Sequence, residues 1–150
     1  MTYINDGGAN LNQSSVSPVL KTDIKLLLFF IFLGFLWIGL RLLNGRVVIP
    51  SLYMLIVFFI LAPVAEEFFF RGFLHNWLKK RITSMYLGVS GANLVTSLLF
   101  AGVHMVGWGA EHGLMVLAPS LLIGILYDRT GRVSFAIFLH SIYNLNAAVV

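Results

Sequence analysis

Two adjacent glutamates and an arginine stand inside a long apolar stretch of the chain, in the segment PVAEEFFFRG at residues 63–72. Charged side chains in such a stretch are costly unless they are paired or face a wet cavity, so they are candidates for function. On a helix, Glu67 and Arg71 are four residues apart and can form an ion pair, whereas Glu66 points about 100° away and lacks a local partner. Glu66 is therefore free to exchange a proton. The alternative interpretation is a buried ion pair that joins two helices, with Glu66 facing water.

Two histidines in other apolar segments extend this set. His104 ends the segment FAGVH, and His140 shares a helix face with Asn144 in the segment HSIYN. A single histidine at such a position is usually a packing residue, but two of them with a glutamate pair and an asparagine are difficult to explain by packing. We leave His75 and His112 out of the candidate site, because the first sits near an expected membrane interface and the second in an expected loop.

The distances of these residues from one expected membrane boundary agree. Glu66 lies thirteen residues before Lys79, and His140 lies eight residues after Arg132, which on helices is about 20 Å and about 12 Å. If the third helix starts thirteen residues before His104, that histidine is also about 20 Å from the boundary. The three side chains can therefore share one layer of the membrane.

The composition places the chain in a membrane. Of its 150 residues, 59% are hydrophobic and 11% are charged, and the mean hydropathy is +0.90. Soluble domains carry about 25% charged residues, so a soluble domain and extended disorder are both excluded. The sequence has no cysteine, which excludes disulfides, thiolate zinc sites and cysteine nucleophiles. We expect the net charge of +4 to flank membrane segments, with no role in binding nucleic acid.

The hydrophobic pattern predicts an all-α fold, a polytopic bundle of about five transmembrane helices around a polar intramembrane cavity. The expected spans are Leu26–Leu43, Val47–Leu78, Met85–Val106, Leu114–Tyr127 and Val133–Val150. The second would be about 48 Å long as one helix, more than the hydrocarbon core of ~30 Å, and we expect it to break at Pro63. We expect residues 1–20 to be a disordered polar arm and residues 21–150 to be a single domain.

The basic residues divide unequally between the two sides of such a bundle. With five alternating spans, seven fall on the side of the N-terminus and two on the other side: Lys21, Lys25, Lys79, Lys80, Arg81, Arg129 and Arg132, against Arg41 and Arg46. Cytoplasmic loops of membrane proteins are enriched in Lys and Arg, so this division predicts a cytoplasmic N-terminus.

Three motifs together resemble those of the CPBP family of intramembrane proteases, the CAAX-protease and bacteriocin-processing family. The family pattern is Glu-Glu-x-x-x-Arg, then Phe-x-x-x-His, then His-x-x-x-Asn, each on its own membrane helix. The chain carries the three motifs in that order, as Glu66 and Glu67 with Arg71, Phe100 with His104, and His140 with Asn144. Each motif alone is weakly specific, but the ordered set within hydrophobic segments is highly specific.

The resemblance implies an intramembrane endopeptidase, an integral multi-pass protein of the bacterial inner membrane. Its substrate would be a peptide or protein with a C-terminal or membrane-anchored segment, cut near the membrane. The chain has fewer spans than the larger eukaryotic prenyl endopeptidases. A second copy of the chain, or another membrane protein, is therefore a candidate to complete the far wall of the substrate cavity.

The motifs also imply a role for each side chain. The implied catalytic residues are Glu66, His104, His140 and Asn144, and the supporting residues are Glu67, Arg71 and Phe100. A glutamate desolvated among phenylalanines is a competent general base for a water that His104 helps to hold, while His140 and Asn144 would donate to the oxyanion. This mechanism needs no cofactor. Glu66, His104 and His140 also form the two-histidine, one-carboxylate set of zinc hydrolases, but we favour the metal-free mechanism because the chain has no His-Glu-x-x-His helix.

Two functions of other classes remain open from the residues alone. The first is a noncatalytic membrane protein of the immunity type, which would bind a partner or peptide through the same polar cavity. The second is a proton-coupled carrier, because buried Glu and His also relay protons. An inverted repeat would favour the carrier, and the sequence shows none.

Overall fold

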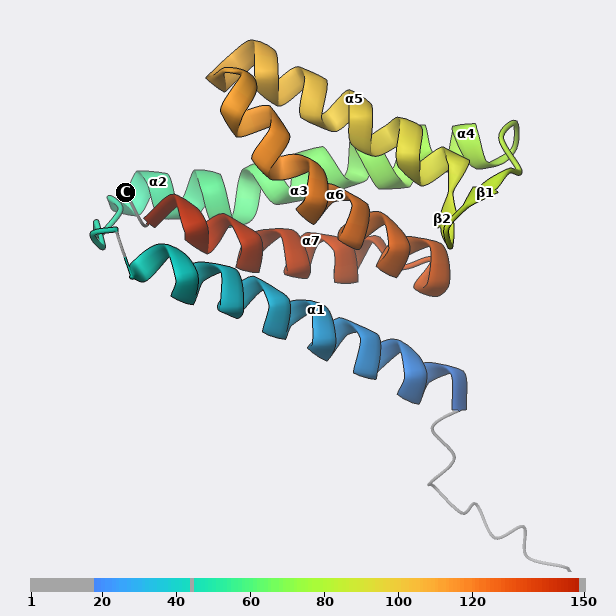
Figure 1. Ribbon diagram of the computed structural model, residues 1–150, viewed down its shortest axis with the longest axis horizontal. Helices are drawn as coiled ribbons and strands as arrows, with labels where there is room; N and C mark the ends of the chain where they lie inside the picture. The colour runs from blue at the N-terminus through green and yellow to red at the C-terminus, as the bar shows by residue number, and fades with distance from the viewer. Residues whose placement is uncertain (1–17, 44, 149–150) are drawn as a thin grey trace, which may run out of the picture.

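A computed structural model describes residues 18–43 and 45–148, which fold into a bundle of five helical segments and one small hairpin (Figure 1). In chain order the elements are α1 (Pro18–Leu42), α2 (Leu52–Ile56), η1 (Val57–Leu61), α3 (Ala62–Glu67), η2 (Phe68–His75), α4 (Asn76–Lys79), β1 (Met85–Tyr86), β2 (Val89–Ser90), α5 (Gly91–Trp108), α6 (Ala110–Thr130), α7 (Val133–Tyr143) and η3 (Asn144–Ala148). The expected fold class is confirmed. The expected N-terminal arm lies outside the described residues, except that α1 already begins at Pro18.

The second helical segment continues through Pro63, so the predicted break is wrong. The 28 residues from Leu52 to Lys79 form one rod, in which η1 and η2 are wound as π-helix. In a π-helix each N–H bonds the carbonyl five residues back, as Ala62 does with Val57. This wider turn shifts the carbonyl that the proline ring would otherwise meet, and the helix therefore continues.

The third helix begins at Gly91, later than the predicted start at residue 85. The residues before it form an antiparallel hairpin, whose turn has positive φ angles of 50° at Leu87 and 84° at Gly88. The Ser90 side chain then accepts a hydrogen bond from the N–H of Asn93 and caps the start of α5. The hydrophobicity of the hairpin residues hid this boundary in the sequence.

The last two predicted spans differ in length from the helices that form there. α6 extends beyond the predicted segment at both ends, whereas α7 has only 11 residues before the 3₁₀ turn η3. Among the described residues, four helices are long and apolar enough to cross a membrane: Lys21–Leu42, Leu52–Lys79, Gly91–Trp108 and Ala110–Thr130. α7 alone reaches about 16 Å, roughly half of the hydrocarbon core. The fifth predicted helix is therefore present, but as described it is shorter than the four that could cross a membrane.

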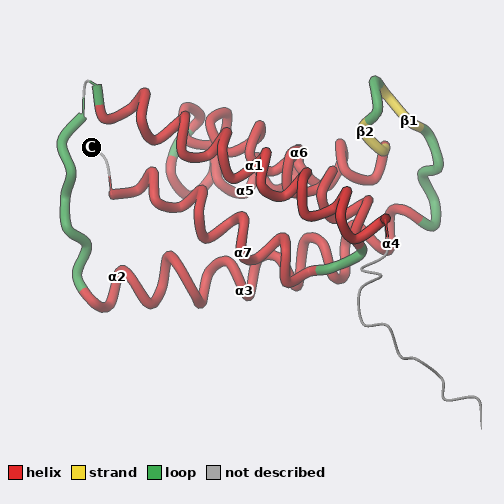
Figure 2. The backbone as a smooth tube through the Cα atoms, turned by 90° about the horizontal axis from the view of Figure 1, so that it is seen from below, coloured by secondary structure: helices red, strands yellow, loops and turns green. Residues whose placement is uncertain are grey.

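α7 lies in the middle of the bundle, between α1 and α6 in Figure 1 and between α1 and α3 in Figure 2, and it contacts all three helices. Its buried residues Ala136 and Leu139 join one hydrophobic cluster with Phe30 of α1 and with Ile123 and Leu126 of α6. The short helix is thus held by neighbours on several sides, and it brings the third motif into the interior of the bundle.

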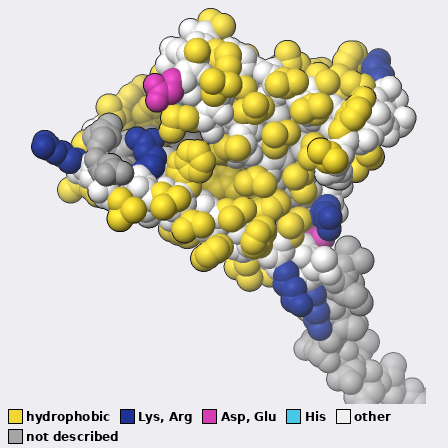
Figure 3. Space-filling model, in the orientation of Figure 1, with side chains coloured by type: hydrophobic (Ala, Val, Ile, Leu, Met, Phe, Trp, Pro, Cys, Tyr) yellow, Lys and Arg dark blue, Asp and Glu magenta, His cyan; other side chains and the backbone are white. Residues whose placement is uncertain are grey.

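The outer surface of the bundle suits a lipid environment. Large apolar side chains are exposed along the helices, such as Leu28, Phe32 and Leu40 of α1. Figure 3 shows one face covered by hydrophobic side chains, with Lys and Arg gathered towards its ends. The start of α1, the end of α4 and the α6–α7 turn lie at one end of the bundle, and the α1–α2 loop lies at the other (Figures 1 and 2). The predicted division of the basic residues therefore corresponds to the two ends of the molecule.

Candidate active site

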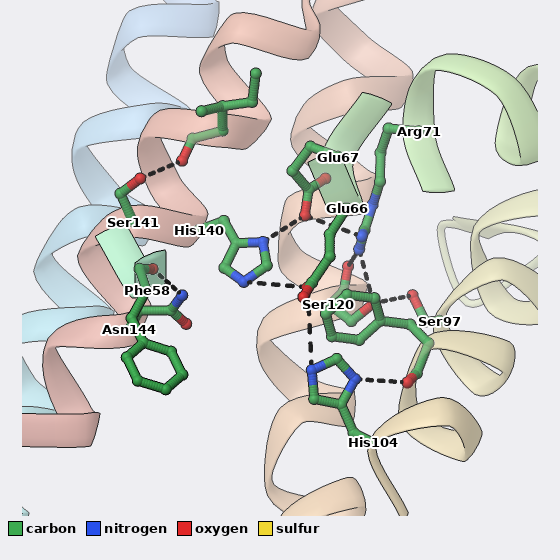
Figure 4. A network of polar contacts seen from close by, with 12 residues as sticks. Phe58, Glu66, Glu67, Arg71, Ser97, His104, Ser120, His140, Ser141 and Asn144 are labelled. Carbon is green, nitrogen blue, oxygen red and sulfur yellow. Dashed lines mark hydrogen bonds and ion pairs between the residues drawn. The ribbon is translucent and has the colours of Figure 1, made fainter. Parts of the chain in front are cut away.

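The carboxylate of Glu66 lies beside two imidazole rings that come from separate helices (Figure 4). Its Oε2 atom is 3.7 Å from Nε2 of His140 in α7 and 4.0 Å from Nε2 of His104 in α5. These distances are too long for direct hydrogen bonds. Oε2 is buried and has no hydrogen-bond partner within the described part of the chain. The spacing suits a small hydrogen-bonded molecule held between the three atoms.

Glu67 and Arg71 form the ion pair that their spacing predicts. Nη1 of Arg71 donates to Oε1 of Glu67 over 3.1 Å, and both side chains are fully buried. Nη2 of Arg71 donates to the backbone oxygen and the hydroxyl of Ser120 in α6, at 2.8 and 2.7 Å. The Ser120 hydroxyl in turn donates to Ser97 in α5. The pair therefore joins helices, as one interpretation of the segment required, while Glu66 remains directed at the histidines.

The Nδ1 atoms of both histidines are bonded to acceptors other than Glu66. Nδ1 of His140 lies 2.7 Å from Oε1 of Glu67, and Nδ1 of His104 lies 2.9 Å from the carbonyl oxygen of Phe100. A backbone carbonyl and an arginine-paired carboxylate can only accept, so Nδ1 is the donor in each ring. Each Nε2 consequently faces Glu66 as a lone pair in a neutral ring, or as an N–H in an imidazolium.

Phe100 packs against both imidazole rings. Its ring stacks on that of His104, with centroids 4.2 Å apart, and meets the ring of His140 edge-on at 5.8 Å. The guanidinium of Arg71 lies 5.3 Å from the same aromatic centroid. Phe100 is itself buried, so it forms a wall of the site and restricts the orientation of both histidines.

The side chain of Asn144 is bonded to another helix. Asn144 follows the last residue of α7, and its Nδ2 donates to the carbonyl oxygen of Phe58 over 2.7 Å. Ser141, three residues earlier, donates to the carbonyl oxygen of Phe59 over 2.8 Å. An asparagine amide carries two hydrogens. The oxyanion role predicted for Asn144 therefore depends on the second of them.

A cavity of about 630 Å³ opens beside these side chains. The motif residues that line it are Glu66, Phe100, His104, His140 and Asn144, and apolar side chains of α1, η1 and α6 supply much of the remaining wall. Apolar walls with a few polar groups are typical of a site that binds an extended or largely apolar ligand. The predicted intramembrane cavity is thus present, and the three motifs contribute polar groups to it.

His112 also lines this cavity, although its sequence context suggested a loop outside the site. α6 begins at Ala110, so His112 lies in the first helical turn, and its ring stacks with that of His104 at 5.7 Å. The ring centroid of Trp108 lies 5.2 Å from that of His104 and 5.8 Å from that of His112. The spacing of four residues between His104 and Trp108 on α5 is the sequence signal for their contact. His112 lies on the next helix, so this spacing rule does not extend to it.

His75 belongs to a separate polar cluster at the hairpin end of the bundle. The carboxylate of Asp128 accepts from Nε2 of His75 at 3.0 Å, from Nζ of Lys79 at 2.9 Å and from the hydroxyl of Ser90 at 2.6 Å. The cluster joins the second helical rod, β2 and α6. His75 is therefore a buried structural residue, apart from the candidate active site.

The zinc alternative can be compared with the same distances. Zinc ligands lie about 2.0–2.2 Å from the metal, so two tetrahedral ligands are about 3.4 Å apart. Oε2 of Glu66 is 3.7 and 4.0 Å from the Nε2 atoms of His140 and His104. Within residues 18–43 and 45–148, no group of three or more His, Asp or Glu is arranged to hold a metal ion. The three side chains would have to move closer together to bind zinc.

Comparison with known proteins gives one family and one relative. A model of the type II CAAX prenyl endopeptidase Rce1-like family matches residues 48–146, which include all three motifs. A protein of Escherichia coli described as an uncharacterized 24.3 kDa protein is 35% identical over 98 residues, which are 61% of this chain and 42% of that protein. The match thus spans less than half of the length of that relative. No solved structure matches the chain.

Proposed function

We propose a function from the premise that this chain belongs to the type II CAAX prenyl endopeptidase Rce1-like family, whose model matches 99 of its 150 residues. The family is a membrane-bound protease family, and four helices of the chain are apolar enough to span a membrane. We propose that the protein is a glutamate-dependent intramembrane endopeptidase. The observation that supports this proposal is the approach of Glu66 Oε2 to two imidazole Nε2 atoms, at 3.7 and 4.0 Å, beside a cavity.

In the proposed reaction, Glu66 activates a water molecule against the carbonyl carbon of the scissile peptide bond. Glu66 takes one proton from the water as the new C–O bond forms, and the carbonyl electron pair moves onto oxygen to give a tetrahedral oxyanion. The oxyanion then collapses, the C–N bond breaks, and the proton passes from Glu66 to the leaving nitrogen. His104 holds the water through Nε2. The products are a carboxylic acid and an amine, which exchange one proton to become a carboxylate and an ammonium group, and Glu66 returns to its starting state.

His140 and Asn144 are the proposed donors to the oxyanion. Because Nδ1 of His140 donates to Glu67, its Nε2 carries a hydrogen only when the ring is an imidazolium. The ionised forms of Glu66, Glu67 and Arg71 sum to one negative charge, so one imidazolium makes the set neutral, as a buried site favours. The second amide hydrogen of Asn144 would complete the pair. A well-placed donor of this kind contributes about 3–4 kcal/mol to catalysis.

The proposed substrate is a protein segment that is C-terminal or membrane-anchored and enters the cavity from the lipid. The apolar cavity walls support this class of substrate, because they leave few polar groups to match. We also propose a bacterial inner-membrane location with the N-terminus in the cytoplasm, since the segments that carry seven of the basic residues lie at one end of the bundle. A second copy or another membrane protein would complete the outer wall of the cavity.

The proposal is tested by cleavage of a membrane-tethered peptide in liposomes that contain the purified protein. Glu66→Gln is expected to lower kcat by about 10²–10⁴-fold, the contribution of a general base. Glu111→Gln removes an exposed carboxylate from the first turn of α6 and is the matched control, with unchanged cleavage expected. Equal cleavage by wild type and Glu66→Gln would overturn the glutamate mechanism.

Two further arms of this experiment separate the other interpretations. We expect a chelator to leave the activity of the wild type unchanged. Loss of activity with the chelator and recovery with zinc would replace the metal-free mechanism by a zinc mechanism that uses Glu66, His104 and His140. Binding of the tethered peptide by the wild type without any cleavage would replace the enzyme by a noncatalytic, immunity-type binding protein.

A further inference from the structure

Pro63 removes one backbone donor from the second helical rod, and two carbonyls of the preceding turn lie where that donor would bond. In an α-helix the N–H of residue 63 would bond the carbonyl of Phe59, and in a π-helix it would bond that of Phe58. Proline has no N–H and serves neither of them. The N–H of Ala62 bonds the carbonyl of Val57, so it does not supply the missing donor to Phe58 or Phe59. An unpaired backbone carbonyl at membrane depth is costly, so the oxygen that residue 63 would have bonded needs a donor from elsewhere.

Two side chains at the end of α7 supply these donors. The hydroxyl of Ser141 lies 2.8 Å from the carbonyl oxygen of Phe59 and 3.0 Å from that of Ile137 in its own helix, and the contact with Phe59 is the shorter one. Nδ2 of Asn144 donates to the carbonyl oxygen of Phe58 at 2.7 Å (Figure 4). Ser141 and Asn144 are three residues apart and therefore lie on one helix face. The same neighbouring helix thus bonds both of the carbonyls that could have accepted a hydrogen bond from an N–H at residue 63.

These two bonds act next to the candidate catalytic side chains. Glu66 lies three residues after Pro63, and His140 lies one residue before Ser141. His140 approaches Glu66 at 3.7 Å and bonds Glu67 at 2.7 Å. A rotation or a shift of α7 that broke the bonds to η1 would also carry His140 away from both glutamates. The bonds from Ser141 and Asn144 to the carbonyls of Phe58 and Phe59 therefore set the register between α7 and the second helical rod, which both carry residues of the site.

We propose that Pro63 and Ser141 are positioning residues of the active site. Pro63 removes the donor that would bond one of the carbonyls of Phe58 and Phe59, and Ser141 and Asn144 bond these carbonyls and hold α7 in register with α3. One amide hydrogen of Asn144 is the anchor. The other is left for the oxyanion role, and Asn144 lines the cavity. The catalytic consequence of this arrangement rests on the proposed function, whereas the pairing of the carbonyls does not.

A double-mutant cycle tests the pairing without reference to activity. Ser141→Ala removes the donor to Phe59, and Pro63→Ala supplies a backbone N–H that can replace it. We expect Ser141→Ala to lower the denaturant midpoint of unfolding of the wild type. In the Pro63→Ala background, the same substitution should lower the midpoint by at most about one third as much. Thr130→Ala is the matched control, because its hydroxyl bonds only within its own helix turn and the α6–α7 turn. Its shift should be the same in both backgrounds. Equal shifts for Ser141→Ala in both backgrounds would overturn the pairing.

Kinetics of the same variants test the positioning role. Pro63→Ala and Ser141→Ala are expected to lower kcat by about 10-fold to 100-fold, with KM within about twofold, because the reacting groups are displaced while the cavity remains. Ser141→Thr restores the hydroxyl and is expected to restore most of kcat, and Thr130→Ala should leave kcat unchanged. A purely structural role would reduce the yield of folded protein and leave kcat per folded molecule unchanged.

The outcomes distinguish this inference from the proposed function. Unchanged kcat in both Pro63→Ala and Ser141→Ala, with an active wild type, would overturn the positioning role. If the wild type cleaves no tethered peptide, the catalytic consequence fails together with the proposed function. In that case the double-mutant cycle alone decides whether bonds to the backbone carbonyls before Pro63 hold α7 in place.

Discussion

Replacing Glu67 by glutamine separates the support of the site from its chemistry. Oε1 of Glu67 accepts from Nη1 of Arg71 at 3.1 Å and from Nδ1 of His140 at 2.7 Å, and the side chain is fully buried. Glutamine has almost the same shape and keeps an acceptor oxygen at this position, but it has no charge. The variant therefore keeps an acceptor for both bonds and removes the negative charge of that acceptor, while Arg71 keeps its positive charge.

The expected loss of stability follows from the two bonds. A hydrogen bond to a charged group contributes about 1.5–3 kcal/mol, roughly twice the value of a neutral one. Loss of the ionic part of both bonds should thus destabilise the protein by about 1.5–3 kcal/mol. Glu67→Ala, which leaves Arg71 and His140 without this acceptor, should cost about 3–5 kcal/mol, as expected when one partner of a buried ion pair is removed.

Equilibrium unfolding in mixed detergent micelles measures these differences. Arg71→Met completes a double-mutant cycle, and the double variant Glu67→Gln, Arg71→Met is expected to be about 1–3 kcal/mol more stable than the sum of the single effects predicts. Strict additivity would refute the buried pair. In the cleavage assay, Glu67→Gln should retain reduced activity, because Glu66 remains in place. Complete inactivation of Glu67→Gln, together with an active Glu66→Gln, would show that the two glutamates have the opposite roles.

Two further predictions concern the packing and the polar cluster at the hairpin end, and the same unfolding measurement checks both. Gly124→Ala should destabilise by about 1–3 kcal/mol, because the added Cβ would overlap the side-chain amide of Asn93, whereas Gly102→Ala has open space and should stabilise by about 0.5–1 kcal/mol. A neutral Gly124→Ala would contradict the close helix contact. Asp128→Asn should destabilise by about 1–3 kcal/mol and Lys79→Ala by less than about 1 kcal/mol, because the carboxylate has buried donors while the lysine is about half exposed. A larger effect for the lysine would contradict this order.

The parts of the structure that depend on local spacing could be predicted from the sequence. The ion pair of Glu67 and Arg71 follows from a separation of four residues on one helix. The depths of Glu66, His104 and His140 allow the approach that the structure shows, because helix rise converts residue number into depth. Depth alone does not say which helices are neighbours. Four apolar spans follow from the length that a lipid bilayer requires.

The sequence-based predictions of secondary structure fail where contacts with residues distant in the chain override the local conformational preference. A proline inside a helix predicts a break, but the π-turn before Pro63 accommodates the proline ring. The carbonyl of Phe59, four residues before the proline, accepts a hydrogen bond from Ser141, which lies 82 residues later in the chain. The glycine and tryptophan residues around His112 suggest a loop, but α6 starts directly after Gly109 and includes His112. No local pattern shows which carbonyls or rings a later helix will meet.

The polar atoms near the site differ in how the fold uses them. Arg71 bonds both Glu67 and Ser120, and Nδ1 of each histidine has its own acceptor, so these groups hold the helices together. Oε2 of Glu66 and the Nε2 atoms of His104 and His140 instead face one another beyond hydrogen-bond distance. In lipid such an arrangement is unfavourable unless a further hydrogen-bonding molecule joins it. A reaction whose nucleophile is a water held by a base and two imidazoles uses this arrangement directly, whereas an ion pair that only joined helices would draw the three atoms into contact.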